Sequence, residues 1–203
     1  MNYDICPLFS VPFYISEIEL DDNEISVLSN SKFEKKGSLD LTVNKYLLNT
    51  KEFARIKKTV NSHIHNYTKN VLQIKDNIKF TITTSWGVRC KPQDYSHMHF
   101  HGNSIFSGVV YFNTDKDSGF FKVYNSGVNR TIIYNYTDFN IFNSTSWSFT
   151  PKKGNIYLFP SHVTHEITKN NSNIERYSIA FNTFFSGEIL YEDLSDINIQ
   201  TIT

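Results

Sequence analysis

The stretch DYSHMHFHGNSIFSGVVYF, residues 94–112, joins a group of histidines to a run of apolar residues. His97, His99 and His101 occupy every second position, and alternate residues of an extended chain point to the same side. Residues 104–112 are rich in Val, Phe, Ile and Tyr, which is the composition of a buried strand. The stretch therefore predicts a β protein in which three imidazoles share one face just before a core strand.

The intervening residues of the histidine group are apolar. Met98 and Phe100 alternate with the histidines, so we expect them to face the opposite way, into apolar packing.

The chain after residue 78 has the same character throughout. Short segments rich in Ile, Val, Phe, Tyr and Thr alternate with Gly, Asn, Pro and Asp, which predicts β-strands and turns. The candidate strands are residues 78–90, 104–113, 119–125, 130–136, 147–151, 155–160, 163–168 and 176–185. This many short strands predicts a mainly β fold, a sandwich or jelly roll, rather than a parallel α/β sheet.

A helix is predicted before these strands, at residues 50–71. One face of this helix is apolar at the spacing of an α-helix and consists of Phe53, Ile56, Val60, Ile64, Tyr67 and Val71. His63 and His65 lie in the same segment, and residues two apart on a helix point about 200° apart. We therefore expect these two histidines to be solvated and unable to share a metal ion.

The chain is expected to form one domain over residues 1–203. Residues 1–77 would supply an N-terminal support, with a short strand within 8–16 and one or two helices flanking the sheets. The jelly-roll core would span residues 78–190.

Composition excludes several classes of protein. Lys and Arg together number 20, as do Asp and Glu, so the formal net charge is zero and the pI is about 7.1. This balance disfavours a protein with an extended nucleic-acid footprint or one that binds anionic membranes. The N-terminus lacks the basic region of a signal peptide, and no apolar run reaches the roughly 18 residues that span a bilayer. The two cysteines are isolated and read as reduced thiols, so we expect a cytoplasmic protein.

The first histidine group has the spacing of a metal site. Same-face residues of a strand lie about 6.5 Å apart, so two imidazoles can reach one ion at about 2.1 Å each. A further ligand would come from His165, which opens a new strand after a turn, whereas His162 lies in the preceding loop. The acidic residue after His165 would face away from the metal. Which of His97, His99 and His101 bind is left open by spacing alone.

A buried arginine is predicted downstream. In the strand RYSIAFNTFF, one face is polar and begins with Arg176 and Ser178, while the other is apolar. A buried guanidinium needs an anion, because an unpaired buried charge is costly. The anion is either an acidic side chain of the protein or the carboxylate of a ligand, which Arg176 could bind in bidentate fashion with Ser178 adding a hydroxyl.

His-x-His, a distal histidine and an Arg-x-Ser motif 11 residues later together resemble the iron(II)/2-oxoglutarate-dependent oxygenases. More narrowly, the chain resembles the 2OG-Fe(II) oxygenase type common in bacteria and marine phages. The matching segments appear in the family order, at residues 85–86, 99–112, 147–167 and 176–187. The resemblance implies a double-stranded β-helix, which is a jelly roll, with Fe(II) at one end of the barrel.

The same resemblance assigns roles to individual residues. It implies that His99 and His165 bind Fe(II), and that Arg176 binds the distal carboxylate of 2-oxoglutarate with help from Ser178. Fe(II), 2-oxoglutarate and O2 would be the cofactor and co-substrates. The family reaction would convert 2-oxoglutarate to succinate and CO2 and hydroxylate a C–H bond of an unknown small molecule or side chain.

One position departs from the family pattern. Most members of the wider superfamily have an acid two residues after the first histidine, which completes a 2-His-1-carboxylate triad, but this chain has His101. Either the triad is all histidine, or water takes the place of the acid, or the pair is His97 and His99. We favour His99 and His101, because the residues that follow align with the family in that register.

Further pocket residues are proposed around the metal. Asn103, Ser107 and Tyr111 are candidates for contact with 2-oxoglutarate, and Ser107 and Tyr111 share a strand face. Trp86 could line the same cavity. For Tyr111 and Trp86, packing in the core is the competing interpretation.

Two other functions compete with the oxygenase. A cupin-type dioxygenase with three histidines would bind its substrate directly and would not use 2-oxoglutarate, and a jelly-roll module without catalysis would have no tight metal site. The oligomeric state is left open, with a homodimer as one candidate.

Overall fold

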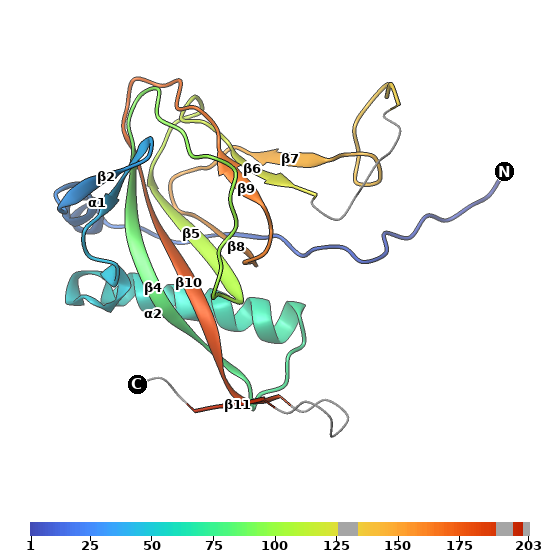
Figure 1. Ribbon diagram of the computed structural model, residues 1–203, viewed down its shortest axis with the longest axis horizontal. Coiled ribbons are helices and arrows are strands. Elements are labelled where there is room, and N and C mark those ends of the chain that lie inside the picture. Colours follow the sequence, from blue (N-terminus) through green and yellow to red (C-terminus); the bar gives the residue numbers. More distant parts are fainter. Residues whose placement is uncertain (126–133, 190–196, 201–203) are drawn as a thin grey trace.

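A computed structural model of the chain describes residues 1–125, 134–189 and 197–200. Its strands form a large sheet and a small sheet, both antiparallel (Figure 1). The large sheet has the order β1 (Tyr14–Glu17), β8 (Asn155–Pro160), β5 (Phe106–Asn113), β10 (Arg176–Ile189), β4 (Lys79–Cys90), β3 (Leu39–Thr42) and β2 (Phe33–Lys36). The small sheet has the order β7 (Ser146–Phe149), β6 (Phe121–Tyr124) and β9 (His165–Ile167), and β11 (Ile197–Ile199) pairs with β10.

The two sheets pack face to face, which confirms the predicted mainly β jelly roll. Between them lies an apolar cluster to which both sheets contribute: Val109, Tyr111, Tyr157, Phe159 and Val163 from the β5 and β8 region, and Phe121 from β6, with Phe13 and Phe149 against them. We call the side of each sheet that faces this cluster the inner face.

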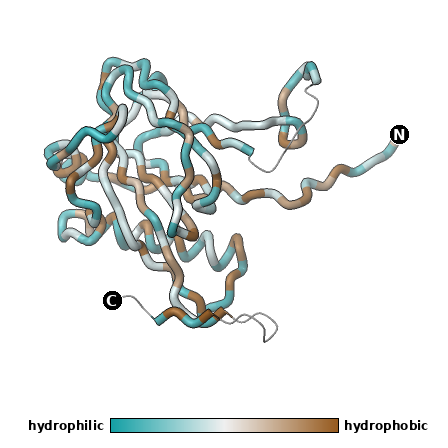
Figure 2. The backbone as a smooth tube through the Cα atoms, in the orientation of Figure 1, coloured by the Kyte–Doolittle hydropathy of each residue, from teal (hydrophilic) through white to brown (hydrophobic). Residues whose placement is uncertain are grey.

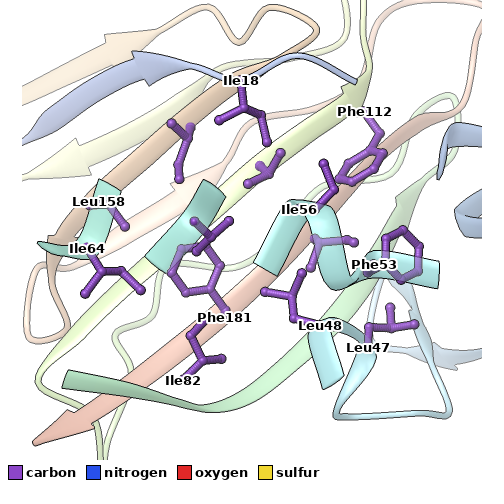
Figure 3. Packing of buried hydrophobic residues seen from close by; sticks show 14 of the residues in the cluster. Ile18, Leu47, Leu48, Phe53, Ile56, Ile64, Ile82, Phe112, Leu158 and Phe181 are labelled. Atoms are coloured by element: carbon purple, nitrogen blue, oxygen red, sulfur yellow. The ribbon is translucent and has the colours of Figure 1, made fainter. Parts of the chain in front are cut away.

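The outer face of the large sheet is covered by helices. Helix α2 (Ala54–His65) crosses this face, and α1 (Asp22–Ser29) lies beside it (Figure 1). Ile56 and Ile64 of α2 pack toward Leu158 and Phe181 of the sheet (Figure 3). The central strand β5 is therefore buried on both faces, which explains why its sequence is almost continuously apolar.

Gly108 shows how closely β5 and β10 pack. A Cβ atom at this position would lie 2.3 Å from Cζ of Phe181 and 2.6 Å from Cδ2 of Leu158. The absence of a side chain at residue 108 lets the ring of Phe181 lie against the sheet.

The predicted helix at residues 50–71 is confirmed except at its end. A 3-10 turn (Lys51–Phe53) precedes α2, and a π-helical turn (Asn66–Val71) follows it. The first five apolar residues of the predicted face are buried, but Val71 is 49 % exposed. The wider π turn changes the angle between successive side chains, so that the α-helical spacing no longer places Val71 on the buried face.

His63 is not solvated as the sequence predicted. Its Nδ1 lies 2.9 Å from the hydroxyl of Tyr14 in β1, and burial lowers the pKa of its imidazole. His65 is exposed, as expected. The two rings therefore lie in different environments and do not share a site.

The sequence also missed the hairpin of β2 and β3, whose strands are short and half polar. Its Asp40 is buried and pairs with Arg89 of β4 and with Lys91. Of the predicted strand at residues 130–136, the first part, 130–133, lies outside the described residues. Residues 134–136 are described and belong to no strand.

The N-terminal arm extends away from the sheets (Figures 1 and 2). It carries exposed apolar side chains, including Leu8 and Phe9, until Phe13 stacks on Phe149 with ring centroids 4.4 Å apart.

Cys6 in this arm and Cys90 in β4 are both free thiols, as predicted. Among the described helices, none has the length and apolar character needed to cross a membrane.

Candidate metal and 2-oxoglutarate site

Three histidines from separate parts of the sequence meet at one end of the two sheets. His99 and His101 lie in the connection between β4 and β5, and His165 opens β9. One ring nitrogen of each lies within 4.8 Å of those of the other two. Backbone hydrogen bonds in both directions between His99 and His165, of 2.9 and 2.8 Å, hold the two residues side by side. This triad is the register that the sequence favoured.

The tautomer of two of these histidines is fixed by the backbone. Nδ1 of His99 lies 2.7 Å from the carbonyl of His97, and Nδ1 of His165 lies 2.8 Å from the carbonyl of Val163. A carbonyl can only accept a hydrogen bond, so each Nδ1 donates and each Nε2 keeps its lone pair. This arrangement leaves the lone pair of each Nε2 available to bind a metal ion.

Burial keeps two of the imidazoles neutral. Burial lowers the pKa of His165 to about 3, and the rings of Phe121 and Phe159 lie 5.1 and 4.9 Å from its ring. Burial and the neighbouring His99 lower the pKa of His101 to about 4. Metal ions bind the neutral imidazole, so both residues are in the required state at neutral pH.

The other residues of the histidine group lie outside the triad. The ring of His97 is exposed and contacts Tyr95, with centroids 5.2 Å apart. Met98 and Phe100 are 55 % and 64 % exposed, so the prediction that they pack into the core is wrong. Apart from the single bridge at His99, residues 94–101 form no regular strand, and the described part of the chain leaves Met98 and Phe100 on their far side open to solvent.

The two candidates downstream of the first group are placed as expected. His162 is exposed in the loop before β9. Glu166 faces away from the triad, and the hydroxyl of Tyr124 donates to its carboxylate at 2.6 Å. Neither residue belongs to the three-histidine group.

Arg176 at the start of β10 is buried with an incomplete set of partners. Only 1 % of the residue is exposed, and its Nη1 donates to the carbonyl of Ser118 at 2.7 Å. Its Nε and Nη2 and the hydroxyl of Tyr111 are buried and have no hydrogen-bond partner among the described residues. The guanidinium carbon lies 5.8 Å from the centre of the Tyr111 ring. Unpaired buried donors are costly, so this cluster fits an anion that accepts from all of them.

The cluster and the triad lie along the same inner face. Arg176, Ser178, Ala180 and Asn182 alternate along β10, and Ser178 pairs with Tyr111 across the β5–β10 ladder. Trp86 pairs with Ala180, and its ring lies 5.9 Å from that of His101. Arg176 thus lies four residues along the strand from the level of the triad, about 13 Å at the backbone. A guanidinium and a five-carbon dicarboxylate can span such a distance.

Two of the predicted pocket residues have other surroundings. The hydroxyl of Ser107 belongs to a buried polar network. It lies 2.8 Å from the hydroxyl of Ser161 and donates to the side-chain oxygen of Asn182, also at 2.8 Å. The network continues from Ser161 to Ser104 at 2.7 Å, and the carbonyl of Ser161 accepts from the backbone of His101. Asn103 is exposed in the turn after His101, with a left-handed φ of 56°.

The sequence did not predict the network, because its members come from three separate segments: residues 104–107, Ser161 and Asn182. A signal was nevertheless present: Ser107 and Asn182 each interrupt an apolar strand on the face that turns out to be the inner one.

Beside the triad, a cavity of about 280 Å³ separates the β2–β3 turn from residues 95–99. A larger hollow of about 750 Å³ runs along α2 and shares no residue with the triad.

Comparison with protein families identifies this arrangement. Residues 84–182 match the family described as "Putative 2OG-Fe(II) oxygenase". Through this segment, which is about half of its length, the chain belongs to the 2OG-Fe(II) oxygenase family. It is therefore an oxidoreductase of the 2OG-Fe(II) type, with Fe(II), 2-oxoglutarate and O2 as its cofactor and co-substrates. The matched segment includes the histidine triad, Tyr111 and Arg176.

Solved structures share the fold of this 2OG-Fe(II) oxygenase at low sequence identity. An oxidoreductase of the 2OG-Fe(II) oxygenase family from Burkholderia pseudomallei has a TM-score of 0.56 and 14 % identity, with 84 % of this chain and 83 % of that chain covered. HygX from Streptomyces hygroscopicus, with nickel, 2-oxoglutarate and hygromycin B bound, has a TM-score of 0.59 and 12 % identity over 85 % and 82 %. The viral collagen prolyl hydroxylase of Paramecium Bursaria Chlorella virus-1 has a TM-score of 0.54 and 15 % identity over 84 % and 94 %.

A comparison with curated proteins found no match. The association of this oxygenase with phages stays a prediction.

Proposed function

We propose that this oxygenase hydroxylates a C–H bond of a small molecule or side chain. 2-Oxoglutarate, O2 and the substrate would give succinate, CO2 and the hydroxylated product. One oxygen atom of O2 enters succinate and the other enters the product, while the bond between C1 and C2 of 2-oxoglutarate breaks. The observation that carries the proposal is the unpaired cluster of Arg176 and Tyr111 on the same inner face as the histidine triad.

The triad would hold the iron through three neutral imidazoles. Nε2 of His99 and of His165 already point their lone pairs away from the backbone, and His101 would supply the third nitrogen. When bound, Fe(II) supplies the activation of O2 that no amino-acid side chain can provide. Three neutral ligands leave the full charge of the ion uncompensated, which favours binding of dianionic 2-oxoglutarate.

Other side chains would bind and orient 2-oxoglutarate. Nε and Nη2 of Arg176 would donate to its distal carboxylate, and the hydroxyl of Tyr111 would donate to the same group. Burial raises the pKa of Tyr111 above its usual value, so the phenol stays protonated and able to donate. The rings of Phe121 and Phe159 shield His165 from water.

The proposal is tested by binding and turnover together. Under anaerobic conditions, Mn(II) or Fe(II) with 2-oxoglutarate should raise the melting temperature more than either alone, and in air the Fe(II) enzyme should release succinate. His165→Ala should abolish the response to metal, and Arg176→Ala should abolish only the response to 2-oxoglutarate. A response to metal without any response to 2-oxoglutarate in the wild type would replace the proposal by the cupin-type dioxygenase.

A further inference from the structure

The two tryptophans of the chain lie on either side of the histidine triad. Trp86 and Trp147 are its only tryptophans, and they come from different sheets. Trp86 projects from the inner face of β4 in the large sheet, and its ring centroid lies 5.9 Å from that of His101. The position of Trp147 follows from strand register.

Trp147 belongs to the same cross-strand row as two histidines of the triad. In β6, Val123 pairs with Trp147 on one side and with His165 on the other, and His165 pairs in turn with His99. Residues paired across antiparallel strands point to the same side of the sheet. Trp147 therefore faces the side on which the imidazoles lie, two strands or about 10 Å from His165.

The inner face is open at the level of the tryptophans and closed at the level of Arg176. Along β10, Arg176 and Ser178 are buried, but Ala180 and Asn182 are partly exposed. Trp86 is also partly exposed, and Trp147 is 45 % exposed although it lies on the inner side. Large aromatic side chains that face a reaction centre and remain open to solvent mark a binding surface.

Among the described residues, the inner-face side chains around this opening are uncharged. The inner-face residues around it are Trp86, Thr84, Ala180, Asn182, Val109, Val123 and Trp147. Lys122, the neighbour of Val123, points to the other face of β6, where its Nζ lies 4.9 Å from the centre of the Tyr124 ring. Three neutral imidazoles, Fe(II) and dianionic 2-oxoglutarate would also sum to zero charge. The charge of Arg176 is buried four residues further along β10, so the described part of the opening favours neither a cation nor an anion.

One polar group among these residues is positioned to select a substrate. Asn182 directs its side-chain oxygen to the hydroxyl of Ser107 at 2.8 Å. The amide nitrogen therefore points to the opposite side of the carboxamide, where it can donate to a hydroxyl or carbonyl oxygen of a ligand. Indole rings offer flat apolar faces, which stack on the flat or apolar face of another ring.

We propose that the opening between Trp86 and Trp147 binds the substrate, and that the substrate presents an uncharged ring bearing a hydroxyl or carbonyl group. This inference rests on the proposed function, because it takes the triad as the reaction centre. The ring would lie between the two indoles, with Asn182 bonding its oxygen substituent and the C–H bond to be oxidised directed at the triad. Aromatic rings and sugar rings share this chemistry.

The experiment uses tryptophan emission, since each indole can be made the only reporter. In Trp147→Phe and in Trp147→Ala, Trp86 is the single tryptophan. Both variants, loaded anaerobically with Fe(II) and 2-oxoglutarate, are titrated with 4-nitrobenzyl alcohol, an uncharged aromatic alcohol whose nitro group quenches indole emission. Acrylamide serves as the collisional control, and 4-nitrobenzoate as the charged control.

Quenching of Trp86 by 4-nitrobenzyl alcohol should saturate in Trp147→Phe, whereas quenching by acrylamide should rise linearly. In Trp147→Ala the dissociation constant should rise at least about fivefold, because one stacking partner is lost while the exposed position tolerates the change. 4-Nitrobenzoate should bind more weakly in both. Displacement of the probe by methyl β-D-glucopyranoside would assign a sugar ring, and displacement by benzyl alcohol alone would assign an aromatic ring.

Linear quenching in both variants, or equal dissociation constants in the two, would overturn the proposal. A change of oligomeric state in Trp147→Ala with unchanged affinity for the probe would also overturn it, by making Trp147 a protein-contact residue. The proposed function is judged separately, from the rise in melting temperature of the wild type with Fe(II) and 2-oxoglutarate. If that rise is present and the probe fails, only the inference about the ring is wrong.

Discussion

Replacing Arg176 by methionine should move two properties in opposite directions. The ligand-free protein buries a guanidinium that has one hydrogen bond, to the carbonyl of Ser118, and two unpaired groups, Nε and Nη2. Methionine has a similar length, fills much of the same space and carries no charge. Arg176→Met should therefore leave the ligand-free protein as stable as the wild type or more stable, while it abolishes the binding of 2-oxoglutarate.

The magnitudes follow from the unpaired groups. Each unsatisfied buried donor costs about 1–3 kcal/mol, against a loss of about 1 kcal/mol for the bond to Ser118. Two such donors, less the lost bond, predict that the free energy of unfolding without ligand rises by about 1–5 kcal/mol. Replacement of buried charges by apolar residues stabilises proteins by a similar amount, about 1–4 kcal/mol. With 2-oxoglutarate, two charge-assisted hydrogen bonds of about 1.5–3 kcal/mol each are lost, which predicts an affinity at least ~100-fold lower.

The assay is urea unfolding at neutral pH, with and without Mn(II) and 2-oxoglutarate, so that no turnover occurs. Tyr111→Phe is the matched variant: it removes one unpaired buried hydroxyl, and its affinity for 2-oxoglutarate should fall to about a tenth to a thirtieth of the wild-type value with no loss of ligand-free stability. A ligand-free Arg176→Met protein that is less stable by 3 kcal/mol or more would refute the reasoning, because it would mean that the guanidinium is compensated within the chain. A retained response to 2-oxoglutarate would refute it equally.

Three further predictions concern the triad, the core and α2. His101→Asp should keep Fe(II) binding because it supplies an anionic ligand, while His101→Ala should weaken Fe(II) binding at least ~10-fold. His97→Ala is the control in calorimetric titrations with Fe(II). Equal Fe(II) affinities in these three variants would contradict the assignment of His101 to the triad. Gly108→Ala should lower the free energy of unfolding by about 1–3 kcal/mol, because its Cβ would lie 2.3 Å from the Phe181 ring; an unchanged urea midpoint would be inconsistent with that packing. Burial lowers the pKa of His63, so the stability that depends on its neutral ring is present above its unfolded pKa of about 6.5 and is lost as the pH falls. His63→Phe should therefore reduce the fall of the urea midpoint between about pH 7 and 5. Parallel pH profiles of the urea midpoint in the variant and the wild type would contradict this prediction.

Strands and site residues were predictable to different degrees. The strands β4, β5 and β10 follow from long runs of β-branched and aromatic residues, and each is found close to its predicted bounds. The hairpin of β2 and β3 was not predictable, because its four-residue strands are half polar and gain their stability from contacts with β4. The wrong placement of Met98 and Phe100 has a related cause: alternation predicts two faces, but it cannot say whether anything covers the second one.

The sequence by itself determined the kind of chemistry. Histidines at alternate positions, a distal histidine and Arg-x-Ser are local features, because side-chain direction along an extended chain depends only on backbone geometry. Only the tertiary structure decided which histidines meet, since the pairing of His99 with His165 joins residues 66 positions apart. It also decided that Nε and Nη2 of Arg176 and the hydroxyl of Tyr111 are buried without a hydrogen-bond partner among the described residues, and that Trp86 and Trp147 face the side on which the triad lies. Burial, register and the meeting of two sheets are properties of chain segments distant in sequence, which no local pattern encodes.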